Sequence, residues 1–240
     1  MILRFLELKG VRDPFIIEFN SDLKIRVRTG DDLTCVWDCW ISEDYRISGN
    51  EKIIVDVGAN IGSFSLYAYY KCPSSRIFAF EPVGSTYSDL VSNIELNGLE
   101  KSIKTVKVGV AGKTGERRID ISDASPYSSL FSPHKDGPNE VISVKSLDAI
   151  VELIGNPKCV DILKMDCEGA EMECLLSANH ETIHRFKKIL LEYHEFSGIK
   201  FETLKAHLTS AGFRCSKIHD DPEYGVGIAW FEQIEGPVLP

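Results

Sequence analysis

The sequence has no apolar run long enough to cross a membrane. A transmembrane helix needs about 18 or more consecutive apolar residues, and no window of this chain comes close to that length. Residues 1–9 alternate charged and apolar side chains and lack the apolar core of a signal peptide. We therefore expect a chain without a transmembrane segment.

Basic residues are also in the minority. Lys and Arg number 27 against 36 Asp and Glu, which gives a formal net charge of −9. Proteins that bind nucleic acid tightly neutralise its phosphates with Lys and Arg. The charge therefore argues against nucleic acid as a partner, and the short basic runs at 117–118 and 184–188 are interpreted as solvated surface.

Paired cysteine motifs are absent. The seven cysteines are scattered and include no C-x-x-C pair that would start a zinc site. Cys167 and Cys174 lie in apolar segments and are interpreted as small hydrophobic residues. The pattern is typical of a reduced, cytoplasmic protein.

The chain lacks a complete dinucleotide-binding motif, but it contains a related loop. The apolar segment 53–57 runs into Gly58-Ala59-Asn60-Ile61-Gly62. Asn60 stands where G-x-G-x-x-G has the middle glycine that makes room for a pyrophosphate. A second apolar segment ends at Glu81, close to the roughly 20 residues beyond the loop at which an acid binds ribose hydroxyls. A nucleoside site is therefore predicted, the alternative being a strand-to-helix turn without a ligand.

The charge beside this loop indicates which nucleoside it holds. Asp56 precedes the loop directly and adds negative charge next to it. A diphosphate is disfavoured there, whereas a ligand with an ammonium and a sulfonium group is favoured. S-adenosylmethionine (SAM) therefore fits the loop better than NAD.

Further short motifs follow along the chain. They are residues 55–62, 80–82, Asn93 with Asn97, 146–148, 162–171 and 191–194. In this order they resemble the FkbM-type methyltransferases, a branch of the class I SAM-dependent enzymes, over roughly residues 25–215. The run from Lys164 to Glu171 is the most specific. The resemblance implies O-methylation of hydroxyls on natural products, sugars or surface glycans.

The expected fold is α/β, a Rossmann-like class I methyltransferase with a seven-strand doubly wound sheet and a small β-rich N-terminal cap. From residue 51 onward, apolar strand patterns alternate with helical patterns, which predicts a parallel sheet. Strands are expected at 53–57, 76–81, 104–110, 160–165, 188–193, 213–219 and 227–231, and helices at 62–71, 85–97, 169–178 and 199–211.

Two domains are predicted. Residues 1–50 form the cap, with a hairpin of 15–19 and 23–28 and a helix within 31–45. Residues 51–240 form the SAM-binding domain, with an insertion at about 112–145 that contains a hairpin. The cap and the loop 123–140 are expected to shape the acceptor pocket. Aromatic candidates for acceptor contacts are Trp37, Trp40, Tyr127 and Phe131, although packing is favoured for the tryptophans.

Four catalytic candidates follow two neighbouring strands: Asp166, Glu168, Glu192 and His194. Open parallel sheets bind ligands beyond the carboxyl ends of their strands, so these side chains are expected to converge. His194 is the expected general base, since its ordinary pKa is about 6.5. Two alternatives stay open: Asp166 or Glu168 caps the following helix, or the cluster holds a divalent cation, which is possible but not favoured.

Expected roles toward SAM follow from the same strand-end rule. Glu81 binds the ribose, the glycine loop holds the methionine side, Val110 forms the adenine wall and Asp166 reaches the ammonium group. The full cofactor set is Asp56, Gly58, Ala59, Asn60, Gly62, Glu81, Val110 and Asp166. The predicted function is O-methylation of a small molecule, sugar or glycan. RNA or protein methylation and non-catalytic SAM binding are the alternatives, and the oligomeric state is not predicted.

Overall fold

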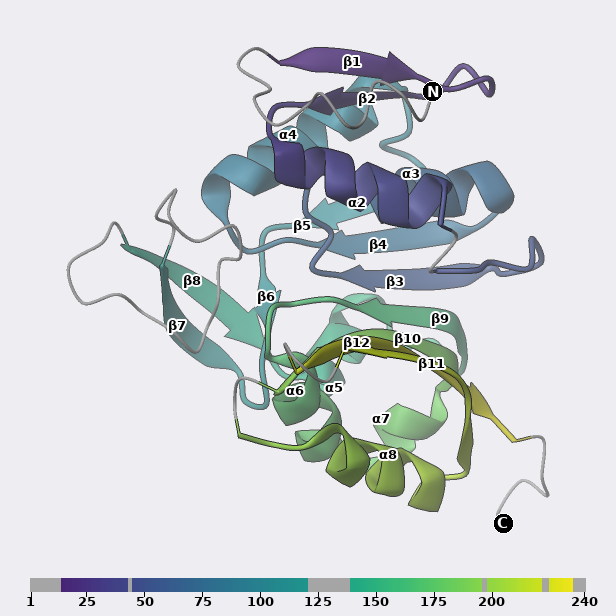
Figure 1. Ribbon diagram of the computed structural model, residues 1–240, viewed down its shortest axis with the longest axis vertical. Helices are drawn as coiled ribbons and strands as arrows, with labels where there is room; N and C mark the ends of the chain where they lie inside the picture. Colours follow the sequence, from purple (N-terminus) through teal and green to yellow (C-terminus); the bar gives the residue numbers. More distant parts are fainter. Residues whose placement is uncertain (1–13, 43–44, 121–138, 196–197, 222–224, 235–240) are drawn as a thin grey trace.

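A seven-stranded sheet forms the centre of the molecule. The computed structural model describes residues 14–42, 45–120, 139–195, 198–221 and 225–234. Its main sheet has the order β11-β12-β10-β9-β3-β4-β5 (Figure 1). The strands are β3 (Ile53–Val57), β4 (Arg76–Phe80), β5 (Ile103–Val106), β9 (Val160–Met165), β10 (Phe186–His194), β11 (Phe213–Asp221) and β12 (Val226–Gln233).

Strand directions match the expected doubly wound fold. Strands β10, β9, β3, β4 and β5 are mutually parallel, and β12 runs antiparallel to both β10 and β11. The parallel strands therefore bring their carboxyl ends to one edge of the sheet. The α/β class I methyltransferase fold predicted from the sequence is confirmed.

Helices cover both faces of this sheet. One face carries α2 (Gly30–Trp40), α3 (Ser63–Lys71) and α4 (Gly84–Leu96). The other carries α5 (Leu147–Leu153), α6 (Glu171–Ser177), α7 (His180–His184) and α8 (Phe201–Ser210) (Figure 1).

Side chains along each strand alternate between the two faces of the sheet and pack against the helices on both. Ile54 packs with α2 and α3, whereas Val55, its neighbour, packs with the cluster under α6 and α8. Successive side chains of a strand point to opposite faces, so a strand buried on both sides is apolar throughout. The short helices α5 and α7 were not predicted.

The expected strand 104–110 was wrong as one element. Strand β5 ends at Val106, and a backbone hydrogen bond of 2.9 Å from Val108 N–H to Val106 O turns the chain. Strand β6 (Gly109–Val110) then leaves the main sheet and joins β8 (Asn139–Lys145) and β7 (Gly115–Asp120) in a small sheet of order β6-β8-β7. The insertion therefore supplies β6 with its partner. Most of the loop expected at 123–140 lies outside the described residues.

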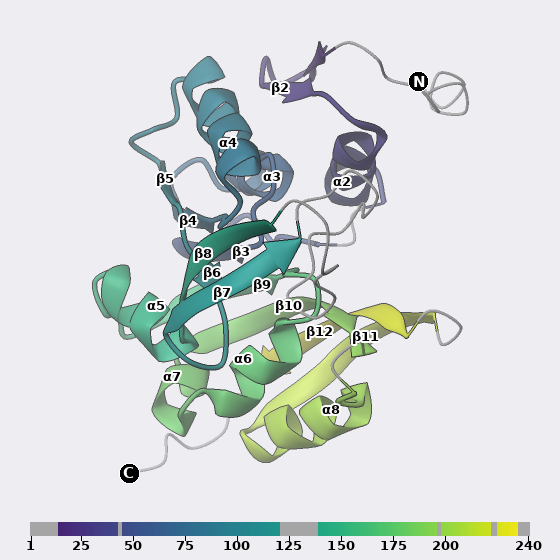
Figure 2. The ribbon, with the colours of Figure 1, turned by 90° about the vertical axis from the view of Figure 1, so that its left-hand side faces the viewer.

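The N-terminal segment is anchored on α3 and α4. Strands β1 (Phe15–Glu18) and β2 (Lys24–Val27) form the expected antiparallel hairpin. The side chains of Asn93 and Asn97 accept hydrogen bonds from the backbone N–H groups of Arg26 and Lys24, each at 2.7 Å. Helix α2 packs on α3 on the same side of the sheet (Figure 2).

Helix α2 begins with a capping box. Thr29 Oγ1 accepts the N–H of Asp32, and the Asp32 carboxylate accepts the N–H of Thr29, both at 3.1 Å. Such a box satisfies backbone donors that a helix start leaves open. The helix ends at Trp40. Within the described residues, none of the helices combines the length and the apolar composition of a membrane span.

Candidate active site

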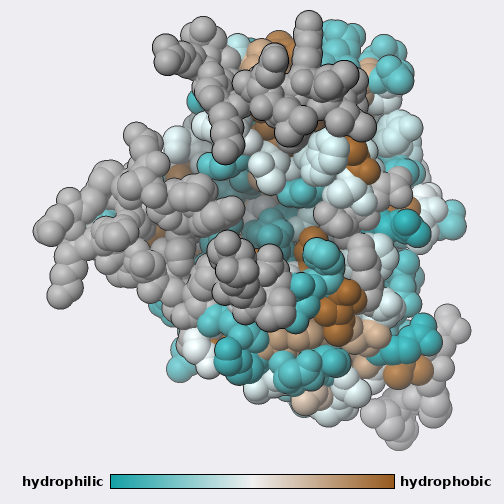
Figure 3. Space-filling view, in the orientation of Figure 1, coloured by the Kyte–Doolittle hydropathy of each residue, from teal (hydrophilic) through white to brown (hydrophobic). Residues whose placement is uncertain are grey.

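A cleft of about 740 Å³ opens at the carboxyl ends of the parallel strands. Hydrophilic side chains gather in the hollow near the middle of the face in Figure 3. Three segments line most of the cleft: residues 28–38 of the N-terminal segment, the loop after β3 together with the end of β4, and the ends of β9 and β10. The small sheet adds Val110, Ile119 and Ile142.

The glycine loop lies tightly against its neighbours. Gly58 has a φ of +71°, and a Cβ at this position would lie 1.6 Å from the carbonyl oxygen of Asp166. The N–H groups of Gly58 and Ala59 donate to the carbonyl of Phe80 at 3.0 and 2.9 Å. Only glycine fits the first loop position, because any side chain would meet backbone atoms of the next strand end.

Glu81 lies where the sequence predicts the ribose acid. Its carboxylate accepts the N–H of Asn60 at 3.1 Å and the N–H of Val83 at 2.9 Å. The side chain lines the cleft although the residue is only 6% exposed. Burial raises the pKa of Glu81 to about 7, and the two backbone donors oppose that rise.

The expected cofactor residues divide into two groups. Those that line the cleft are Gly58, Asn60, Glu81, Val110 and Asp166. Ala59 and Gly62 shape the loop from behind: Gly62 donates its N–H to Ala59 O at 2.8 Å and has a φ of +91°.

Asp56 is not beside the ligand space, contrary to the expectation. It is fully buried beneath the loop, where Ser65 Oγ donates to it at 2.7 Å and Lys164 Nζ lies 3.4 Å away. Its charge is therefore directed to Lys164 rather than to a ligand.

Lys164 is a site residue that sequence reasoning missed. It is 4% exposed, donates to the carbonyl of Gly58 at 2.8 Å and lies 3.6 Å from the Asp166 carboxylate. Burial lowers the pKa of this ammonium group, but Asp56 and Asp166 outweigh burial and raise it above its ordinary value. Its role could have been inferred from the sequence, because Lys164 is the only Lys in the apolar strand β9 and lies in register with Asp56 of β3.

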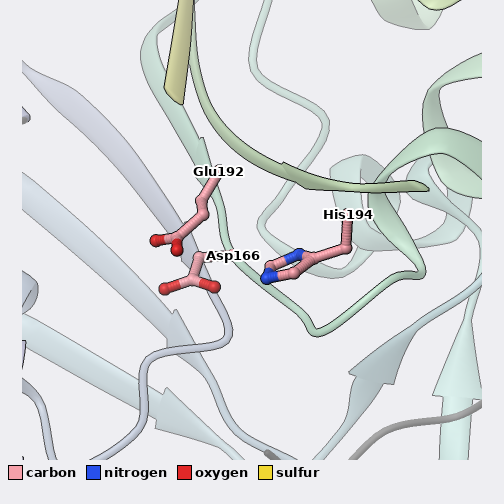
Figure 4. Close-up of side chains that lie close together, drawn as sticks. All are labelled: Asp166, Glu192 and His194. Carbon is pink, nitrogen blue, oxygen red and sulfur yellow. The ribbon is translucent and has the colours of Figure 1, made fainter. Parts of the chain in front are cut away.

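The ends of β9 and β10 bring the catalytic candidates together. Possible ligand atoms of Asp166, Glu192 and His194 all lie within 4.8 Å of one another (Figure 4). Asp166, Glu168 and Glu192 line the cleft, and His194 is buried behind them, 4% exposed. The Tyr45 hydroxyl donates to Glu192 Oε2 at 3.0 Å.

His194 lies between two carboxylates. Its Nε2 is 3.5 Å from Glu168 Oε2, and its Nδ1 is 3.4 Å from Glu171 Oε1. Burial lowers the pKa of the imidazole, but the contact with Glu171 and the charges of Glu171 and Glu168 raise it to about 9. The resting imidazole is therefore protonated at neutral pH, above the value of about 6.5 on which the predicted base role depends.

The neighbouring carboxyl groups also hold protons strongly. Burial, followed by the charge of Asp166, raises the pKa of Glu168 to about 8. The charge of Asp166, followed by burial, raises the pKa of Glu192 to about 8. Together with His194 they form a cluster that shares protons near neutral pH.

Glu171, a second missed residue, holds the loop that leads into α6. It is fully buried and accepts the N–H of Cys167 at 2.6 Å and of Gly169 at 3.0 Å. Glu168 and Gly169 have φ values of +54° and +104°. The capping expected of Asp166 or Glu168 is thus performed by Glu171. The signal was a Glu just inside the expected helix start, where a carboxylate satisfies open N–H groups.

The sheet order, the glycine loop and the acid that ends β4 define a class I methyltransferase. The chain belongs to the FkbM methyltransferase family, because the model of the methyltransferase FkbM domain matches residues 56–215.

Three of the curated relatives are named as methyltransferases. "Methyltransferase 1" of Beauveria bassiana is 30% identical over 183 residues, covering 68% of this chain and 73% of the relative. "Methyltransferase sdnD" of Sordaria araneosa is 28% identical, covering 68% and 74%. The 31-O-demethyl-FK506 methyltransferase FkbM of Streptomyces tacrolimicus is 23% identical, covering 67% and 72%.

Solved structures share the fold. The FkbM methyltransferase of Methylobacillus flagellatus KT superposes with a TM-score of 0.55 at 18% identity, over 82% of this chain and 47% of that one. TrmK of M. capricolum, solved in complex with S-adenosylhomocysteine, superposes with a TM-score of 0.50 at 11% identity, over 83% and 70%.

Proposed function

We propose that this chain is a SAM-dependent O-methyltransferase that acts on a hydroxyl of a small molecule, sugar or glycan. One observation carries the proposal: a nucleoside-binding wall and a proton-sharing cluster face the same cleft. The wall consists of the loop 58–62 with Glu81. The cluster consists of Glu168 and Glu192, which line the cleft beside Asp166, and of His194, which is buried behind them.

The residues of the wall fit SAM. Each carboxylate oxygen of Glu81 holds one backbone N–H and keeps accepting capacity for a ribose hydroxyl. Of the described residues that line the cleft, eight are acids and one, Arg28, is basic. Glu81, Glu168 and Glu192 hold protons near neutral pH. The negative charge of the remaining acids favours an ammonium and a sulfonium over a diphosphate. When bound, SAM supplies a methyl group activated on a positively charged sulfur.

The cluster supports removal of a proton from a hydroxyl. Glu168 and Glu192 have pKa values of about 8 and His194 of about 9. Groups of this strength take up a proton efficiently near neutral pH once they have lost their own. The predicted catalytic roles of Asp166, Glu168, Glu192 and His194 are retained here as proposals. Because the resting imidazole is protonated, His194 acts within the cluster rather than as a lone base.

The cleft walls indicate an uncharged or cationic acceptor. Asp31 and Asp38 line the cleft, and Arg28 is paired with Asp89. A phosphorylated acceptor would meet repulsion there. Trp40 stacks on Phe19 with ring centroids 3.7 Å apart, which supports packing as its role. Tyr127 and Phe131, the other proposed aromatic contacts, lie outside the described residues.

Two further observations support O-methylation and a reduced setting. The Streptomyces tacrolimicus relative is named as a methyltransferase of 31-O-demethyl-FK506. All seven cysteines are free, which fits the reduced, cytoplasmic setting that we propose.

Calorimetric titration with SAM, followed by a screen of hydroxylated acceptors with labelled methyl, tests the function. We expect SAM to bind the wild type and the surface control Glu181→Gln equally and Glu81→Ala much more weakly. Label is expected in a neutral hydroxyl compound. Labelled methyl in RNA or protein would show that the acceptor is a macromolecule and not a small hydroxyl compound. SAM binding without a methylated product from any acceptor would favour a non-catalytic SAM-binding protein.

A further inference from the structure

Two carboxylates and one imidazole meet at the ends of two adjacent strands. Asp166 directly follows β9, and Glu192 and His194 are among the last three residues of β10. One possible ligand atom from each lies within 4.8 Å of the other two (Figure 4). Two ligand atoms of one ion lie at most about 4.4 Å apart when each metal–ligand distance is about 2.0–2.2 Å. These two carboxylates and one imidazole can therefore enclose a single cation after a small closing movement of the side chains.

Each of the three side chains is held from behind by a different element. Lys164 Nζ lies 3.6 Å from Asp166 Oδ2, and the Tyr45 hydroxyl donates to Glu192 Oε2 at 3.0 Å. Glu171 Oε1 lies 3.4 Å from His194 Nδ1, and Nε2 on the other side of the ring lies 3.5 Å from Glu168 Oε2. Ligating histidines ordinarily have a carboxylate on the other ring nitrogen, and ligating carboxylates are themselves hydrogen-bonded. The cluster therefore has outer partners as well as ligands.

We propose that Asp166, Glu192 and His194 bind a divalent cation of the Mn²⁺ type. Mg²⁺ and Ca²⁺ prefer oxygen ligands alone, whereas an imidazole beside two carboxylates suits first-row transition ions. None of the three ligands is a thiolate, which argues against a soft ion. Asp166 and Glu192 line the cleft, so three protein ligands leave coordination positions open on the side of the substrate.

This inference rests on the proposed function and deepens it. A cation at these three residues would bind the acceptor oxygen and lower the pKa of its hydroxyl. Because Glu192 and His194 act as ligands in this arrangement, the hydroxyl proton passes to solvent through the open cleft rather than to these two residues. A lone pair of the oxygen then forms the new O–C bond while the C–S bond breaks and its electron pair stays on sulfur. Asp166 serves the cation in this arrangement rather than the ammonium group of the cofactor.

Titration of the metal-free protein with Mn²⁺, followed by calorimetry and electron paramagnetic resonance, tests the site. We expect saturable binding of one ion to the wild type and to Asp38→Asn, which removes an acid from the same cleft outside the cluster. Glu192→Gln and His194→Gln should each weaken binding at least about tenfold. Glu171→Gln keeps its side-chain size and should weaken binding about tenfold through His194.

Folding, metal binding and methyl transfer are measured in separate experiments. Circular dichroism establishes that each variant is folded, and saturable stabilisation of the wild type by Mn²⁺ in thermal unfolding gives an independent readout. Absence of saturable Mn²⁺ binding to the wild type, or equal binding to Glu192→Gln, would overturn the site. Methyl transfer that is unchanged by EDTA would overturn its role while the proposed function stands. Binding of Mn²⁺ by a protein that does not bind SAM would support the metal site but refute the proposed methyltransferase function.

Discussion

Lys164 and Asp56 form a buried ion pair beneath the glycine loop, with Nζ 3.4 Å from the carboxylate. The two residues are 4% and 0% exposed and face each other across neighbouring parallel strands. Because Lys164 also donates to the carbonyl of Gly58, the pair connects the sheet interior to the loop that shapes the nucleoside wall.

Removing the ammonium group should destabilise the fold strongly. Lys164→Met leaves Asp56 buried without its counterion, which costs about 3–5 kcal/mol when one partner of a buried pair is removed. The control Lys187→Met breaks an ion pair with Asp161 at the surface and should cost less than about 1 kcal/mol. Urea unfolding of both variants measures the difference. An equal decrease in the free energy of unfolding for both variants would show that the buried pair stabilises the protein no more than the surface pair.

Adding one methyl group to the loop should separate close contact from backbone strain. Gly58→Ala places a Cβ 1.6 Å from a carbonyl oxygen, whereas Gly98→Ala has nothing within 4 Å although its φ is +65°. Gly98→Ala should therefore cost only the strain of a positive φ, about 1–2 kcal/mol. Gly58→Ala should cost at least about 2 kcal/mol more and weaken SAM binding. Similar unfolding curves for the two variants would contradict the tight contact.

Glu81 should make stability depend on pH. Its pKa is raised from 4.5 to about 7 in the folded protein, so the folded state holds a proton that the unfolded state releases. The resulting stability is fully present below about pH 4.5 and is lost as pH rises through about 7, by up to about 3 kcal/mol. Glu81→Gln removes this dependence, so wild type and variant should diverge between about pH 5 and pH 8 in urea unfolding. Parallel pH profiles would refute the raised pKa.

The same ionisation should control SAM binding in the opposite direction. The ionised carboxylate accepts ribose hydroxyls, so the affinity of the wild type should rise as pH increases through about 7. Glu81→Gln should bind SAM more weakly with little dependence on pH. Calorimetry at several pH values measures both, and an affinity for SAM that falls as pH rises would contradict the ribose assignment.

Asn93 should fix the N-terminal hairpin to the rest of the molecule. Its side chain accepts the N–H of Arg26 at 2.7 Å and donates to the carbonyls of Arg26 and Ile61 at 3.2 and 2.9 Å. Asn93→Ala leaves these backbone groups unsatisfied, at about 1–3 kcal/mol for each buried group. Ser92→Ala, which removes an exposed hydroxyl from the same helix, is the control. Hydrogen exchange should show faster opening of β1 and β2 only in Asn93→Ala.

Local patterns were sufficient to predict most of the fold. The strand ending at Glu81 and the glycine loop follow from apolar periodicity and turn residues, which act over a few neighbours. The split of 104–110 into β5 and β6 could not be predicted in this way. It depends on β8, about 30 residues away, which pairs with β6 and draws it out of the main sheet.

The candidate site shows the same limit. The strand-end rule places Asp166, Glu192 and His194 together, because parallel strands end at one edge. The burial of Asp56 could not be predicted from its position beside the loop, since its environment depends on Lys164 across the sheet. The charge of His194 likewise depends on Glu171, which lies more than 20 positions earlier and reaches it only in the folded chain.

Helix α2 and the residue that precedes its cap form one side of the cleft, yet the match to the family domain starts at residue 56. A fragment cut at that boundary would retain the loop and Glu81 but would lack Arg28, Asp31 and Asp38 from the wall of the cleft. It would also lose the first three residues of β3 and would uncover Phe64 of α3, which packs in the same cluster as Leu33 and Val36 of α2. We propose that this segment shapes the acceptor pocket, so chimeras that exchange only the segment before residue 56 are expected to transfer acceptor preference between members of the family.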